Sequence, residues 1–438
     1  MRALSRREFL KVAGLAAIGL GLGACAPKEG AKGGVSPGKE DVALELWWHE
    51  YGEEGTHEAA LRIAKEYSEQ TEGVTLESVW NPGDYNQKLD TALAAGTGPD
   101  AYESQANIDK VANGYCIALD EVFEETLNDW SPADLNRVTI KGHKYGIPMM
   151  VDFQMFCLRP SMLKAAGVST PTNWDELVEA GIACTSGRQK GLFLGNDGGL
   201  GTCGQRIARA AGVNFFMEED DTPEIRFNQD ETVMAWEKLA DLHANHSDIL
   251  LTGAPSDWWD PGAFNQGMCA IQWMGFWSTA MIIDAVGDDY EFIAFPPVGS
   301  GPNAKNRIDR GGWVALVNGQ GEHIPEATAL QKWLWVDNTD FQIEWNTAYG
   351  YKALPRISLN AQVERLKAGQ PKHAVEMVNE YGYVVGQLWS GVMGTAVSDA
   401  VTNIVKNGAD ARSEMQTAYD KCVAELDIVL EKVEKLPG

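Results

Sequence analysis

The stretch GHKYGIPMMVDFQMFCLR, residues 142–159, decides the fold. It opens with turn-forming residues and continues as a largely apolar run with one carboxylate, Asp152, in its middle. A short apolar run bounded by Gly and Pro is typical of a buried strand. Burying a lone carboxylate costs several kcal/mol. Asp152 is therefore expected either to pair with an Arg or Lys elsewhere in the fold, or to face a ligand from a strand that crosses between two lobes.

Strands and helices alternate on the N-terminal side of this stretch. Apolar residues follow strand periodicity at 44–48, 74–79 and 101–104, and helical periodicity at 60–67 and 85–95. The alternation predicts a parallel, doubly wound sheet, in which ligands bind beyond the carboxyl ends of the strands. The residues that this rule places at the binding edge are His49, Glu50, Ser104, Gln105 and Asn107.

The size and charge of the chain limit the function classes. A chain of 438 residues exceeds what one core can support, so two lobes are expected. The net charge of -26 argues against nucleic acid, which is bound through clustered Lys and Arg, and weakly favours a neutral or cationic small ligand. The 15 tryptophans indicate either stacking on ringed ligands or an aromatic-rich core.

Residues 1–25 resemble an export signal. Paired arginines at 5–11 stand in the setting of a twin-arginine signal, and the apolar run 12–24 is too short and glycine-rich for a permanent membrane span. The sequence LGAC at 22–25 resembles a lipobox, in which Cys25 becomes the lipidated first residue. Residues 26–40, rich in Gly, Lys and Pro, suit a flexible tether.

Two loops beyond the crossing strand carry candidate ligand groups. The Gly-rich segment 195–199 follows a predicted strand at 191–194, but it lacks a phosphate-binding signature, so it is interpreted as a loop in which Asn196 reaches the ligand. The segment 256–261 places Trp258 and its neighbour Trp259 between two carboxylates.

Helices are predicted at 172–184, 325–338, 392–405 and 411–433.

Several motifs together resemble one known family. The segments 142–156 and 165–180, and FNQGMCAIQWMGFW at 264–277, are similar to the extracellular solute-binding proteins of family 1, the sugar receptors of ABC importers. The resemblance implies an α/β fold of the two-lobe periplasmic-binding-protein type (type II), each lobe a doubly wound, mostly parallel sheet, joined by a multi-segment hinge. Phe276 departs from the family, where Pro is common.

The resemblance also implies roles for single residues. Asp152 would hydrogen-bond sugar hydroxyls, Trp277 would stack on a sugar ring, and the segment RGGW with Arg310 and Trp313 would face the cleft. Tyr349 belongs to a return toward the second lobe, and Trp389 lies one residue from the family's last stacking aromatic.

In the resulting assignment, each lobe is built from two separate segments of the chain. The N-terminal lobe is expected to comprise 41–150 and 290–347, with 292–297 as the strand that returns to it. The C-terminal lobe is expected to comprise 151–289 and 348–438.

The function implied by the resemblance is that of a non-enzymatic receptor. It would deliver a mono- or oligosaccharide to ABC permease subunits, as a monomer held outside the cytoplasm by its N-terminal lipid, with no cofactor. Two alternatives remain: a receptor for a polyamine or other small polar solute, and a secreted glycoside hydrolase in which Asp257 and Asp260 act as the carboxylate pair.

Metal and disulfide chemistry are weakly indicated. His243 and His246 alone make an incomplete zinc site, so no metal is expected. The six cysteines other than Cys25 permit disulfides outside the cytoplasm, but a protein folded before export would equally keep them as buried thiols.

The lipobox gives the first testable prediction. Cys25→Ala should leave the protein unprocessed or release it from the membrane, because no thiol remains to carry the lipid. Membrane fractionation and intact-mass measurement of the variant check this. Unchanged mass and membrane retention would contradict the lipoprotein interpretation.

Overall fold

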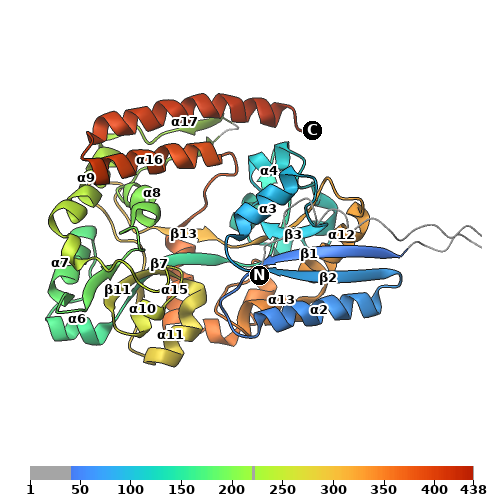
Figure 1. The fold of residues 1–438 in the computed structure, drawn as a ribbon, viewed down its shortest axis with the longest axis horizontal. Helices are drawn as coiled ribbons and strands as arrows, with labels where there is room; N and C mark the ends of the chain where they lie inside the picture. The colour runs from blue at the N-terminus through green and yellow to red at the C-terminus, as the bar shows by residue number, and fades with distance from the viewer. Residues whose placement is uncertain (1–40, 220–221, 438) are drawn as a thin grey trace, which may run out of the picture. The chain divides into compact units, whose positions relative to one another are not determined.

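The computed structural model describes residues 41–219 and 222–437. The export signal and tether predicted at 1–40, including Cys25, lie outside the described residues. Two main sheets organise the rest, and strand β7 links them near the centre of Figure 1.

The first sheet has the strand order β2-β1-β3-β14-β6. Its strands are β1 (Val42–His49), β2 (Val74–Asn81), β3 (Ala101–Ser104), β14 (Val314–Val317) and β6 (Ile147–Pro148). Strands β2 and β3 both pair with β1 in parallel, as the strand–helix alternation predicts, whereas β14 runs antiparallel to β3 and β6. The carboxyl ends of the three N-terminal strands therefore lie at one edge.

The second sheet has the order β15-β13-β7-β11-β8, and β12 also pairs with β7. Its strands are β7 (Asp152–Leu158), β8 (Lys190–Phe193), β11 (Cys269–Gly275), β12 (Glu291–Ile293), β13 (Ile308–Gly311) and β15 (Gly382–Tyr383). β7 runs antiparallel to β11, β12 and β13, so this sheet is mixed, unlike the mostly parallel one expected. The physical reason is that β7 enters directly from β6 and not through a helical crossover.

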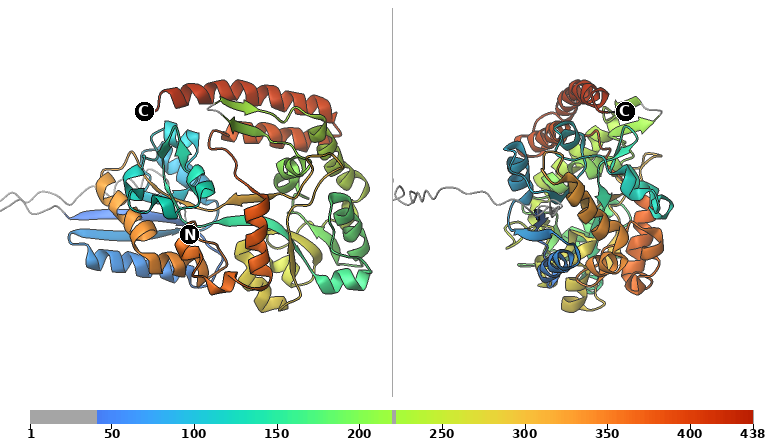
Figure 2. Two further views of the ribbon diagram at one scale, coloured as in Figure 1. Left: turned by 180° about the vertical axis from the view of Figure 1, so that it is seen from behind. Right: turned by 90° about the vertical axis from the view of Figure 1, so that its right-hand side faces the viewer.

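Helices surround both sheets, and two short hairpins complete the fold (Figures 1 and 2). In segments 41–148 and 312–347 the helices are α2 (Thr56–Gln70), α3 (Tyr85–Ala94), α4 (Ile108–Ala112), η1 (Asp120–Phe123), η2 (Leu127–Asp129), α5 (Pro132–Asn136), α12 (Ile324–Lys332), η5 (Trp333–Asp337) and α13 (Thr339–Thr347). In segments 152–311 and 348–437 they are α6 (Pro160–Ala166), α7 (Trp174–Cys184), α8 (Leu200–Ala210), α9 (Asp230–Asn245), η3 (Ser247–Ile249), α10 (Gly262–Asn265), η4 (Phe276–Ser278), α11 (Thr279–Val286), α14 (Ile357–Asn360), η6 (Glu364–Leu366), α15 (Gly369–Tyr381), α16 (Gly391–Asn407) and α17 (Ala411–Glu434). The hairpins are β4 (Thr139–Ile140) with β5 (His143–Lys144), and β9 (Phe216–Glu219) with β10 (Thr222–Ile225).

Local sequence accounts for most helix boundaries. The predicted start near residue 172 is confirmed: Asn173 caps α7 by accepting from the Glu176 N–H, while the Glu176 carboxylate accepts from the Thr172 N–H. The helix predicted over 325–338 is confirmed over nearly its whole length: α12 covers Ile324–Lys332, and the π-helical turn η5 continues it to Asp337. Asn338 then caps α13, which explains why the helix cannot run on.

The prediction that the strand at 292–297 returns to the first lobe is wrong. Both β12 and β13 pair with β7 of the second sheet, so the chain crosses to the first sheet only between β13 and β14. Apolar strand periodicity at 292–297 correctly indicated a strand, but periodicity carries no information about which sheet a strand joins.

The crossing backbones lie against one another. Val151 forms a β-bridge with Ala353, and the Asn346 side chain donates to the Met149 carbonyl. Gly312 has a φ of 123°, and a Cβ there would lie 2.3 Å from the Met150 carbonyl oxygen, so only glycine fits at this crossing. The two sheets are therefore joined by three backbone segments packed together.

A close contact between α7 and β8 gives the second prediction. A Cβ on Gly191 would lie 1.9 Å from the Gly181 carbonyl oxygen. Gly191→Ala should therefore lower the free energy of unfolding by about 1–3 kcal/mol, as overpacking does elsewhere, measured by urea denaturation. Gly52→Ala is the control, because nothing lies within 4 Å of a Cβ there. Equal stability of the two variants would contradict the contact.

Candidate functional site

Several of the predicted site residues lie where the two sheets join. Asp152 begins β7 and pairs with Gly311 at the end of β13, while Gly275 at the end of β11 pairs with Gln154. In the first sheet, Val314 at the start of β14 pairs with Ser104 at the end of β3. The register therefore brings the carboxyl ends of β1, β3 and β11 toward the same crossing, as the rule for α/β sheets predicts.

Asp152 lies at this crossing in a poorly solvated position. Its side chain is buried, and one carboxylate oxygen accepts a hydrogen bond from the Phe153 N–H at 3.1 Å. Burial raises the pKa of Asp152 to about 8, with the nearby Glu53 carboxylate adding to the shift and the cations of Lys352 and Arg137 opposing it. Lys352 is instead ion-paired with Glu53, and both are buried. Asp152 thus lacks a dedicated cationic partner among the described residues.

A second buried carboxylate, Glu103, organises the first sheet's edge. It accepts hydrogen bonds at 2.6 Å from the His49 backbone N–H and at 2.5 Å from the Tyr51 hydroxyl, and its oxygen lies 2.6 Å from the His49 Nδ1. The His49 ring in turn stacks on Trp313, with centroids 4.1 Å apart. Glu103 therefore fixes an aromatic surface formed by His49, Tyr51 and Trp313.

Sequence reasoning missed Glu103 and Tyr51. The signal was present for Glu103, because a charged residue inside the buried strand at 101–104 resembles the pattern at Asp152. Tyr51 follows β1 and carries no motif of its own; desolvation, reinforced by Glu103, raises its pKa well above the usual value.

Three indoles form the corresponding surface on the second sheet. Trp277 follows β11, and its six-membered ring covers Gly275 so closely that a Cβ there would lie 2.0 Å from it. Trp258 approaches Trp277 edge-on, with ring centroids 6.0 Å apart. The backbone carbonyl of Trp259 accepts a hydrogen bond from the Trp277 indole N–H. Trp277 and Trp258 are half-buried, whereas Trp259 is exposed.

The side chains of two predicted ligand residues instead form hydrogen bonds to other groups of the protein. Arg310 donates to both oxygens of the buried Asp134, at 2.7 and 3.2 Å. Asn196 clamps the neighbouring loop, accepting from the Ala254 N–H and donating to the carbonyls of Ala254 and Ser256. These two side chains position the site and are already hydrogen-bonded.

The other predicted residues occupy varied positions. Asn107 caps α4, the Gln105 amide donates to the Gly312 carbonyl at 3.0 Å, and Tyr349 donates to the Glu344 carboxylate. Ser104 is buried and Glu50 is exposed.

Trp389 packs edge-on against aromatic rings of the second lobe. Its ring centroid lies 6.1 Å from that of Phe215 and 6.5 Å from that of Phe227, and its side chain is only half-buried. Two residues before it, the Gln387 carbonyl accepts from the Ile108 N–H. The segment that carries Trp389 therefore reaches the residue after Asn107.

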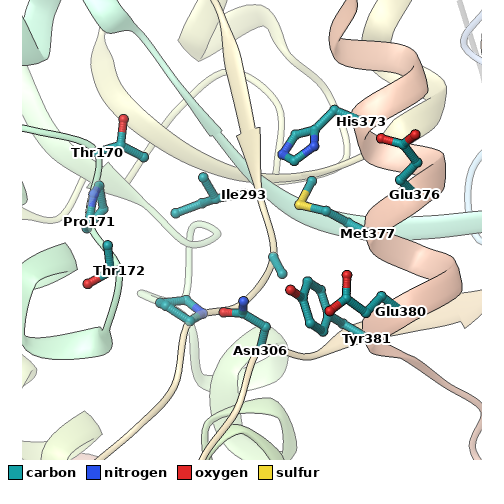
Figure 3. Close-up of a pocket in the computed structure, with 12 residues that line it drawn as sticks. Thr170, Pro171, Thr172, Ile293, Asn306, His373, Glu376, Met377, Glu380 and Tyr381 are labelled. Carbon is teal, nitrogen blue, oxygen red and sulfur yellow. The ribbon is translucent and has the colours of Figure 1, made fainter.

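A pocket of about 380 Å³ lies elsewhere, between α15 and the segment 170–172 (Figure 3). Figure 3 shows His373, Glu380 and Tyr381 of α15 on one side and Pro171 on the other. The residues predicted from the sequence do not line it. Its acidic side chains are exposed, so it lacks the buried polar groups that distinguish a specific site.

The cysteine and histidine side chains of the described residues can be located individually. Within 41–219 and 222–437, no three His, Cys, Asp or Glu side chains are grouped as a metal site. The six cysteines there are buried free thiols, and burial raises the pKa of Cys116, Cys203 and Cys422 to about 12. No helix in this part of the chain is long and apolar enough to cross a membrane.

Comparison with known proteins identifies the family. The family described as bacterial extracellular solute-binding protein matches residues 62–368, more than half of the chain. The chain therefore belongs to the bacterial extracellular solute-binding proteins, which are located outside the cytoplasm. No curated protein sequence matches it.

Solved structures confirm the two-lobe fold. A Thermotoga lettingae solute-binding protein bound with α-D-tagatose has a TM-score of 0.73 at 19% identity, covering 88% of this chain and 99% of that one. The Thermus thermophilus maltotriose-binding protein has a TM-score of 0.70 at 16% identity, covering 88% and 100%. The GacH receptor of Streptomyces glaucescens has a TM-score of 0.69 at 17% identity, covering 90% and 99%.

The buried Asp152 gives the third prediction. Its pKa of about 8 exceeds the ordinary value of 3.8, so between about pH 4 and pH 8 the unfolded chain releases a proton that the folded protein keeps. Stability contributed by this group therefore falls as pH rises through that window. At pH 8 the free energy of unfolding of Asp152→Asn should exceed that of the wild type by more than about 1 kcal/mol, so the variant is the more stable protein. Near pH 4 the two free energies of unfolding should be equal.

Urea titrations at pH 4, 6 and 8 measure this difference. Asp175→Asn is the control, because that exposed carboxylate pairs only with Lys238 at the surface. A variant less stable than the wild type at pH 8 would mean that Lys352 and Arg137 compensate the buried charge.

Proposed function

We propose that this protein is an extracytoplasmic receptor that binds a sugar between its two lobes and delivers it to the permease of an ABC importer. The observation that carries the proposal is the Trp277 indole, held flat against Gly275 beside the strand that begins with Asp152. One ring face is covered by glycine, so the opposite face is the one available to a ligand.

Sugars suit this combination of groups. A pyranose has an apolar C–H face that an indole covers, and hydroxyls that pair with carboxylates once water is expelled. Asp152 is buried without a dedicated cation, and its pKa of about 8 means that it keeps its proton near neutral pH. Its carboxyl group would therefore donate one hydrogen bond to a sugar hydroxyl and accept others.

Similar structures support the ligand class. Their bound ligands are tagatose, acarbose and maltotriose, and the fold match covers nearly the whole of each. These ligands range from one ring to several, so they support carbohydrate as the class and leave the length open.

The hydrolase alternative is not favoured by the site. Asp257 accepts hydrogen bonds from the backbone N–H groups of Asn196 and Trp258, and Asp260 accepts from that of Gly262. Both carboxylates are therefore engaged by backbone donors in their own turns, which supports a binding role over the hydrolase alternative.

The proposal also covers how the receptor is anchored to the membrane and how its two lobes move. A lipid on Cys25 with the tether 26–40 would hold the receptor at the membrane as a monomer. The segments 41–148 and 314–347 would form one lobe and 152–311 and 348–438 the other, closing about the packed crossings at 149–151 and 312–313.

Trp277→Ala provides the fourth prediction and the test. Calorimetric titration of the wild type with mono- and oligosaccharides, and with putrescine, should detect a sugar and not the polyamine. Trp277→Ala should then weaken sugar binding by about 1.5–3 kcal/mol, the worth of a large apolar contact, while thermal stability falls only slightly because the side chain is half-buried.

Trp273→Ala, on the strand β11 that Trp277 follows, is the matched control. Trp273 is fully buried, so its truncation should cost about 3–5 kcal/mol of folding stability. If Trp277→Ala loses stability on that scale while its sugar affinity is kept, Trp277 is a packing residue. Binding of putrescine with no sugar response would replace the sugar receptor by an amine receptor.

A further inference from the structure

Trp259 is an exposed aromatic on a firmly held loop. Its side chain is 53% exposed, although it lies between the half-buried Trp258 and the turn at Asp260. A single exposed apolar residue is ordinary on a protein surface. What distinguishes Trp259 is the number of hydrogen bonds that fix the backbone presenting it.

A buried glutamine holds this loop from below. Gln272 of β11 is fully buried, and its amide donates to the carbonyls of Trp258 and Asp260 at 3.2 and 2.8 Å. Its carbonyl oxygen accepts from the Phe264 N–H at 3.1 Å. The backbone carbonyls of the two residues on either side of Trp259 are thus hydrogen-bonded to a side chain of the second sheet.

The loop is also held from the side of β8. Asp257 accepts from the N–H groups of Asn196 and Trp258, both at 2.8 Å, and Asn196 clamps residues 254–256 through its own side chain. A backbone constrained on both sides loses little further entropy when a ligand binds, so the Trp259 ring is preorganised.

Trp259 is continuous with the proposed sugar surface. The Trp277 indole donates to the Trp259 carbonyl at 3.1 Å. The ring centroid of Trp258 lies 6.0 Å from that of Trp277 and 6.2 Å from that of Trp259, with interplanar angles of 61° and 81°. The three indoles therefore form one continuous aromatic series that runs from Trp277 through Trp258 to Trp259.

We propose that Trp259 is an outer stacking platform and that the ligand is an oligosaccharide of at least two rings. Trp277 takes one ring and Trp259 takes a ring further along the chain. This inference rests on the proposed sugar-receptor function and specifies its substrate class: a monosaccharide would leave the Trp259 ring in water.

The test compares ligand length with the identity of residue 259. Calorimetric titrations of the full-length protein use glucose, maltose and maltotriose, mannose, mannobiose and mannotriose, and the corresponding xylose and galactose series. In the series that binds, the wild type should bind a two- or three-ring sugar at least about tenfold more tightly than the single ring, a gain typical of one added aromatic contact.

Trp259→Ala should abolish that gain. Affinity for the longer sugar should fall about tenfold, affinity for the single ring should stay within about twofold, and Trp259→Phe should keep most of the gain. The melting temperature should be unchanged in both variants, since the ring is exposed. Leu61→Ala, which truncates a 50% exposed side chain on α2, is the control and should leave all affinities unchanged.

The outcomes separate this inference from the proposed function. Equal binding of one-ring and longer sugars, or equal affinities for wild type and Trp259→Ala, would overturn the outer platform while the sugar receptor stands. Loss of affinity for every length in Trp259→Ala would make Trp259 a support for Trp277, and would also overturn it. No response to any of the four series would overturn the sugar receptor, and the platform with it.

Discussion

The Arg137 guanidinium holds together the backbones on which both lobes depend. It donates to the carbonyls of Met150 and Gly312, which lie on two separate crossings between the sheets, and it contacts the buried Asp134. Arg310, from β13, donates to the same Asp134. Buried carbonyls at a crossing have no strand partner, so Arg137 supplies donors that the sheets cannot, while Arg310 helps to hold Asp134 in place. Met150 and Gly312 stand two residues before the first residues of β7 and β14, so these contacts help to place the start of both strands.

The binding edge shows how the same physics produces both stability and function. Glu103 is buried but surrounded by donors from His49 and Tyr51, so it organises structure. Asp152 is buried with a single backbone donor, so a charge on it would be poorly satisfied and the group keeps its proton up to about pH 8. A protein selected only for stability would remove such a group. In the proposed sugar site, a buried carboxyl group of this kind would exchange hydrogen bonds with the hydroxyls of the ligand.

Sequence reasoning predicted the parts of this molecule that depend on local pattern. The strand at 101–104, the helix from Trp174 to Cys184 and the crossing strand at Asp152 follow from periodicity and caps. It could not predict which sheet β12 joins, because pairing depends on distant chain, nor that Arg310 and Asn196 would be occupied by Asp134 and by the loop at 254–256. Residue type indicates what a side chain can bind, and only the fold decides which partner reaches it first.

The six buried thiols have a consequence for where the chain can fold. Because none is paired and burial raises the pKa values of all six, few thiolates exist at neutral pH to attack a disulfide or an oxidant. The folded body at 41–437 therefore neither needs an oxidising compartment to complete its structure nor exposes a reactive sulfur on entering one. A change of redox environment would therefore meet few reactive thiolates in the folded state of these residues.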